Sequence, residues 1–168
     1  MKRIEHRSAQ MCDLLSTKEF PSLEDTSTSR AYLAEIKAIQ GNATNDARFV
    51  ATLLAKEHHA KRYGLQDFDA TDKPQGVPGI DIDVQLPDGK SLVAEIRTTT
   101  PYIPNDLGAQ QKTTFEKDCI ELTNATADVK LFLVTEVRTF QLMKKPKYRS
   151  QLRGVSIVLL TTDEEFAA

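Results

Sequence analysis

Two acidic residues, Asp81 and Glu95, are the side chains of this sequence whose types and spacing best suit chemistry. Each lies in a segment where apolar and polar residues alternate, which predicts a strand, and the tripeptide Pro87-Asp88-Gly89 lies between the two segments. This tripeptide fits a three-residue hairpin loop, a type I turn followed by a left-handed glycine. The loop sets Asp81 opposite Glu95, with Cβ atoms about 5 Å apart.

The loop length decides which side chains share a face of the hairpin, which we place at residues 79–98. With a three-residue loop, one face carries the charged side chains Asp81, Asp83, Glu95 and Arg97, and the other carries the apolar side chains Ile80, Ile82, Val84, Leu92, Ala94 and Ile96. A two-residue Asp88-Gly89 turn would place Asp81 and Glu95 on opposite faces. We favour three residues because Pro87 suits the first turn position and because the faces then separate by chemistry.

Two facing carboxylates repel each other unless a positive charge lies between them. Mg²⁺ suits this position, with Mn²⁺ as a substitute, because it takes oxygen ligands and is often held by one or two carboxylates plus phosphate oxygens. The sequence therefore predicts a metal site at Asp81 and Glu95, with Asp83 as a further ligand candidate. Such an ion would polarise a phosphodiester and activate water, and Arg97 would stabilise the developing negative charge.

The segments Pro78-Gly79-Ile80-Asp81 and Ala94-Glu95-Ile96-Arg97-Thr98, joined by a hairpin, resemble the PD-(D/E)xK nuclease superfamily. The resemblance implies a restriction-endonuclease-like α/β fold, a mixed β-sheet flanked by helices, with Asp81 and Glu95 as the metal-binding carboxylates. It implies a Mg²⁺-dependent DNA endonuclease of the kind found in restriction or defence systems. In some members the preceding helix adds an acidic residue, for which Glu57 is the candidate.

Arg97 stands where this superfamily has a lysine, and arginine is a bulkier, planar group that stays protonated. Three interpretations remain open. Arg97 stabilises charge in an active enzyme, or Lys112 near the start of the next helix replaces the lysine, or the centre is inactive and the protein only binds DNA. Gln111 and Lys112 are also accessory candidates, because a helix N-terminus can offer groups to a phosphate.

The remaining patterns predict the elements around the hairpin. Helical spacing predicts helices at 2–15, 26–40 and 45–63, the third with an apolar stripe of Phe49, Val50, Leu53 and Leu54. After a loop at 67–78 and the hairpin, we expect a helix at 108–126, a buried strand at 129–134, a short helix at 137–144, a buried strand at 155–160 and a frayed acidic tail. Residues 1–43 form a predicted helical N-terminal arm, and residues 44–168 the core domain.

Composition restricts the class of protein. The 168 residues carry a net charge of −2, and neither a secretory signal nor a long apolar run is evident, so we expect a cytoplasmic protein without membrane contact. Cys12 and Cys119 are too far apart in the sequence to suggest a zinc motif. One segment is strongly basic and is the candidate contact to the DNA backbone, through Lys144, Lys145, Lys147, Arg149 and Arg153.

Two further functions compete with the nuclease. One is a non-catalytic DNA-binding or partner-binding module with the same fold. The other is an assembly subunit with a helical arm, in which the hairpin carboxylates are plain surface. For the nuclease we expect DNA as the partner and either a homodimer, with one site per strand, or a subunit of a larger assembly.

Overall fold

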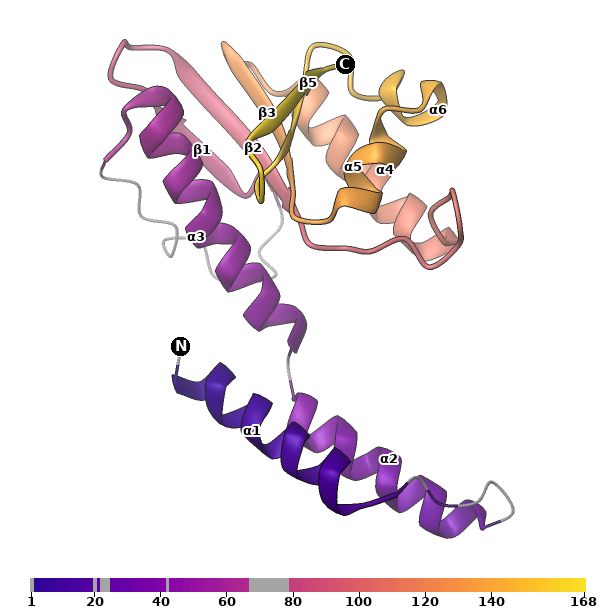
Figure 1. Cartoon of the computed structure of the whole chain (residues 1–168). Helices are drawn as coiled ribbons and strands as arrows, with labels where there is room; N and C mark the ends of the chain where they lie inside the picture. Colours follow the sequence, from indigo (N-terminus) through magenta and orange to yellow (C-terminus); the bar gives the residue numbers. More distant parts are fainter. Residues whose placement is uncertain (1, 20, 22–24, 42, 67–78) are drawn as a thin grey trace. The chain divides into compact units, whose positions relative to one another are not determined.

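The structure, a computed structural model, describes residues 2–19, 21, 25–41, 43–66 and 79–168 (Figure 1). The helices of this part are α1 (Lys2–Thr17), α2 (Thr26–Gln40), α3 (Ala43–Tyr63), α4 (Ala109–Asn124), α5 (Val137–Met143) and α6 (Pro146–Arg149). The strands are β1 (Ile82–Gln85), β2 (Ser91–Arg97), β3 (Val129–Val134), β4 (Ser156–Leu159) and β5 (Glu164–Ala167). The loop expected at 67–78, and with it Pro78 of the motif, lies outside the described residues. None of the helices in the described ranges has the length and apolar character needed to cross a membrane.

The chain divides into two compact units, residues 1–46 and 47–168, whereas the sequence suggested a boundary after residue 43. In the first unit α1 and α2 pack against each other, and Leu14 and Tyr32 are their buried apolar side chains. Asp25 caps α2 by accepting a hydrogen bond from the Thr28 backbone nitrogen at 3.0 Å.

The second unit is built on one mixed sheet with the strand order β1-β2-β3-β4-β5. The pairs β1–β2 and β4–β5 are antiparallel, and the pairs β2–β3 and β3–β4 are parallel. The parallel pairs require crossover connections, which α4 supplies between β2 and β3, and α5 with α6 between β3 and β4. The predicted mixed sheet flanked by helices is thus confirmed.

Helices cover both faces of this sheet. Leu92, Ala94 and Ile96 of β2 belong to a core cluster with the α3 alanines, whereas Val93 belongs to a second cluster with α4 and α5 side chains. Residues 92–96 are consequently all buried. The face of β2 that carries the charged side chains is therefore not open to solvent, because α4 covers it.

Most of the residues predicted to form the apolar stripe of α3 are exposed, so this prediction was wrong for them. Phe49, Val50 and Leu53 are 45%, 38% and 40% exposed, while Ala51 and Ala55 are fully buried against the sheet. Small side chains let the α3 backbone approach the strands closely, so the helix packs through its alanines rather than its larger residues.

Three further details differ from expectation. β1 begins at Ile82, and Ile80 packs against the cluster on the α4 side rather than with Ile82. The acidic tail does not fray but forms the edge strand β5, and α6 was not predicted. Phe166 of β5 packs against the core, which accounts for the order of the tail.

Candidate active site at the Asp81–Glu95 pair

The hairpin register that places Asp81 and Glu95 is the one expected from a three-residue loop. Ile82 pairs with Ala94, and one more step of the same register sets Asp81 opposite Glu95. The Leu86 nitrogen donates to the Lys90 carbonyl at 2.8 Å, and Gly89 has a φ of +86°. The two-residue alternative is therefore excluded, and the two carboxyl groups meet.

Asp81 is held in place from two sides. Its Oδ2 accepts a hydrogen bond from the Ile96 backbone nitrogen at 3.0 Å, and its Oδ1 forms an ion pair with Arg48 of α3. The Asp81 side chain is only 13% exposed. The guanidinium and the backbone donor together fix the orientation of this carboxyl group.

Glu95 is buried in β2, with 4% of its surface exposed, and its Oε1 has no hydrogen-bond partner among the residues described. Burial, and next the negative charge and hydrogen bond of Asp81, raise the pKa of Glu95 to about 8. At neutral pH Glu95 therefore keeps its proton. A protonated acid with a free oxygen next to a carboxylate is a site that a divalent cation can enter by displacing the proton.

Arg97, the third residue expected at this site, lies on the same face of β2 and forms an ion pair with Asp118 of α4. The two side chains are 22% and 7% exposed, and burial lowers the pKa of Arg97 while Glu95 and Asp81 raise it. Arg97 Nε is buried and has no hydrogen-bond partner within the described ranges. The guanidinium is thus only partly engaged by Asp118.

Sequence reasoning missed the two partners Arg48 and Asp118, whose only signal is a charged side chain on a helical face that tertiary packing buries. Arg48 lies three residues before the buried Ala51, and Asp118 lies three residues after Phe115 of the buried α4 stripe. A charged residue on a buried helical face needs a partner of opposite charge. The buried faces of the two helices therefore indicate residues that face the charged side chains of the hairpin.

The other site candidates lie away from this pair. Asp83 and Glu57 are exposed, and no ion pair of the described residues involves either. Gln111 accepts a hydrogen bond from the Gly108 nitrogen at 2.9 Å and donates one to the Thr100 carbonyl at 2.8 Å, so it fastens the loop before α4. Lys112 pairs with Asp106 of the same loop at 2.8 Å, which does not support its replacing the superfamily's lysine.

Much of the basic segment expected at the DNA backbone is engaged within the protein. Lys144 pairs with Glu164 at 2.7 Å, Lys147 pairs with Asp106 at 3.0 Å, and Lys145 donates to the Asn105 side chain at 3.2 Å. The remaining two basic side chains are exposed, with Arg149 over the Phe166 ring and Arg153 near a turn.

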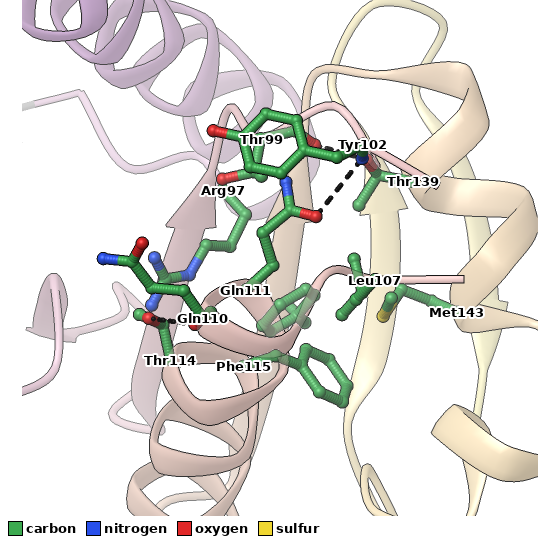
Figure 2. Close-up of a pocket in the computed structure, with 11 residues that line it drawn as sticks. Arg97, Thr99, Tyr102, Leu107, Gln110, Gln111, Thr114, Phe115, Thr139 and Met143 are labelled. Atoms are coloured by element: carbon green, nitrogen blue, oxygen red, sulfur yellow. Dashed lines mark hydrogen bonds between the residues drawn. The ribbon is translucent and has the colours of Figure 1, made fainter. Parts of the chain in front are cut away.

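A pocket of about 210 Å³ opens next to Arg97, between the end of β2 and the first turns of α4 (Figure 2). Figure 2 shows the Arg97 side chain extending toward Gln110 and Thr114, with Tyr102 and Phe115 at opposite ends. The pocket thus adjoins the carboxylate pair through Arg97.

The described part of the chain contains no group of three or more His, Cys, Asp or Glu side chains placed to hold a metal ion. Two carboxylates are nevertheless enough for Mg²⁺ when water and phosphate oxygens complete its coordination. The unpartnered Glu95 Oε1 beside Asp81 fits such an ion. Comparison with protein-family models, curated proteins and solved structures finds no match to this chain.

Proposed function

We propose that this protein is a metal-dependent DNA endonuclease that hydrolyses phosphodiester bonds at the Asp81–Glu95 pair. The observation that carries the proposal is that Glu95 is buried with an unpartnered Oε1 and faces Asp81 across the hairpin. A buried acid with a strongly shifted pKa beside a second carboxylate is a frequent mark of a functional site.

Asp81 and Glu95 would hold the metal, Mg²⁺ or Mn²⁺ in its place, and the exposed Asp83 is less favoured as a third ligand. When bound, the ion supplies a Lewis acid for the phosphate and lowers the pKa of coordinated water. Arg48 holds the Asp81 carboxyl group in place through an ion pair. Arg97 adds positive charge beside the pair, and Asp118 fixes its position.

The element order supports the same assignment. A hairpin carrying the two acids is followed by the crossover helix α4 and by β3, which pairs parallel to β2, as the resemblance to PD-(D/E)xK nucleases implies. A restriction-endonuclease-like fold is therefore part of the proposal, together with DNA as substrate and a homodimer or larger assembly as the working form.

The Arg97–Asp118 ion pair favours a second candidate, a nuclease-fold module that binds DNA or a protein without cutting. An arginine engaged by a buried aspartate replaces the superfamily's lysine poorly if that lysine must move a proton. By contrast, an assembly subunit with plain surface carboxylates does not agree with the burial of Glu95.

The test is cleavage of a supercoiled plasmid with Mg²⁺ or Mn²⁺ by wild type, Asp81→Asn and Glu95→Gln. We expect each substitution to reduce the nicking rate by about 100-fold or more, in the range lost when a catalytic acid or base is removed. Asp83→Asn is the matched control, because it removes one exposed carboxylate from the same hairpin, and it should retain activity.

Equal nicking by wild type and both site variants would refute the nuclease, since the activity would come from elsewhere. Absence of nicking together with salt-sensitive DNA binding would favour the binding module. Calorimetric titration with Mn²⁺ gives a second readout, because Glu95→Gln should abolish ion binding and Asp83→Asn should not.

A further inference from the structure

The pocket beside Arg97 is lined largely by apolar and aromatic side chains that have no role in the proposed cleavage chemistry. Its floor is apolar and comprises Leu107, Phe115, Phe132 and Met143, all of them buried. Phe115 and Phe132 meet edge to face, with ring centroids 5.6 Å apart. At about 210 Å³ the pocket is smaller than the ~300–1,000 Å³ of sites for drug-sized ligands, so it suits one ring system.

Most polar groups around the pocket are already engaged by the protein. Thr139 donates its hydroxyl to the Thr99 carbonyl, and Thr114 donates to the Gln110 carbonyl at 3.0 Å. The Gln111 amide is occupied by the loop before α4. Arg97, in contrast, lines the pocket with a side chain that is 22% exposed, and Asp118 is the ion-pair partner of one of its terminal nitrogens, so its guanidinium can donate to an acceptor atom on a ligand.

Tyr102 provides an aromatic surface at the pocket mouth. It is 81% exposed, yet its backbone is fixed, because the Tyr102 nitrogen donates to Gln111 Oε1 at 3.3 Å. Its ring also lies close to Gly108, where an added Cβ would come within 3.4 Å of Tyr102 Cδ2. An exposed aromatic ring held in place costs little entropy when a second ring stacks on it.

We propose that this pocket binds a single unstacked nucleobase of a nucleic-acid strand, with Tyr102 as the stacking partner and the Arg97 guanidinium as the donor to a base oxygen or nitrogen. This inference rests on the proposed function, because the strand is the one whose phosphate would lie at the neighbouring Asp81–Glu95 pair. Aromatic side chains beside a cation are the usual means of binding unpaired bases.

The test measures binding of fluorescein-labelled single-stranded tetranucleotides, in deoxy and ribo form, by fluorescence anisotropy in EDTA. Tyr102→Ala should weaken binding by about tenfold, within the range lost with one base stack. Tyr102→Phe keeps the ring and should bind like wild type. Ile103→Ala is the control, because Ile103 is an exposed residue of the same loop that does not line the pocket.

A tetranucleotide with abasic positions separates base binding from backbone attraction. The wild type should bind it about as weakly as Tyr102→Ala binds the intact strand. The inference is overturned if the wild type binds no tetranucleotide, if Tyr102→Ala binds like wild type, or if Tyr102→Ala weakens the abasic strand equally. The deoxy and ribo strands show which sugar is preferred.

The two proposals can fail separately. Binding in EDTA needs neither metal nor cleavage, so Tyr102-dependent binding with no nicking activity would overturn only the nuclease. Nicking that depends on Glu95 while Tyr102→Ala leaves binding unchanged would overturn only the base pocket.

Discussion

Glu95 is an acid in an environment that stabilises its neutral form. It lies in the central part of β2, covered by α4, with Asp81 as its cross-strand neighbour. A buried charge next to a like charge is costly, and the protein avoids the cost by keeping the proton. The free energy of unfolding must therefore depend on pH through this residue.

In EDTA we expect the free energy of unfolding to fall as pH rises from about 4.5 to about 8, because the folded protein keeps the Glu95 proton and the unfolded chain releases it. The slope due to Glu95 is at most about 1.4 kcal/mol per pH unit, and it vanishes above pH 8. Glu95→Gln mimics the neutral acid, so its stability relative to wild type should increase from pH 5 to pH 9. Urea denaturation at pH 5, 7 and 9 measures both proteins, and identical pH slopes would contradict the shifted pKa.

The Arg97–Asp118 ion pair joins β2 to α4 under partial burial. We expect Asp118→Ala to lower the free energy of unfolding by about 3 kcal/mol, because it leaves the Arg97 charge buried without a partner. The double variant Arg97→Met with Asp118→Leu should be closer to wild type than Asp118→Ala, since neither charge remains. Chemical denaturation of the single and double variants measures the coupling, and additive losses would show that the pair does not interact.

At the scale of the elements, the hairpin loop determines which side chains the site contains. Gly89 has a φ of +86°, and nothing lies within 4 Å of an added Cβ. Glycine is therefore required here for its backbone conformation and not for lack of space. A loop one residue shorter would turn Asp81 and Glu95 to opposite faces.

We expect Gly89→Ala to lower the free energy of unfolding by about 1 kcal/mol, because alanine rarely adopts a left-handed backbone. Gly89→Asn should cost less, since asparagine tolerates that conformation. Thermal unfolding of the two variants gives the comparison, and an equal loss in both would argue that backbone strain is not the cause.

An element could be predicted from the sequence where the residues that determine it lie within one short segment of the chain. The hairpin register was predicted because Pro87-Asp88-Gly89 contains the whole signal. The buried face of α3 was missed because Ala51 and Ala55 are buried by tertiary packing, while the larger apolar residues beside them remain exposed. Arg48 and Asp118 were missed for the same reason. Strand β5 was missed because its one apolar anchor, Phe166, lies among charged and small residues.

At the scale of the whole molecule, the described residues of the two hydrophobic clusters all lie at Ala51 or later in the chain. The first unit, residues 1–46, is compact in itself. Its own contacts include an ion pair between Arg7 and Asp46, which a shortened chain would lose.

We expect a chain of residues 43–168, which keeps α3 entire, to unfold cooperatively. Its Tm should lie within about 4 °C of the full chain, because loss of a partly exposed ion pair costs no more than about 1 kcal/mol. Circular dichroism on heating measures this, and loss of a cooperative transition would show that the first unit is needed for folding of the second.

Strand β5 has a further consequence for the behaviour of the protein in solution. It forms an edge of the sheet, it is only four residues long, and Glu164 and Glu165 begin it. A bare strand edge is a template on which further copies can assemble into fibrils, and short edges with charged side chains resist such growth. The same acidic tail that completes the sheet thus also opposes its extension by a second copy, because so short an edge offers few backbone groups with which a further strand can pair.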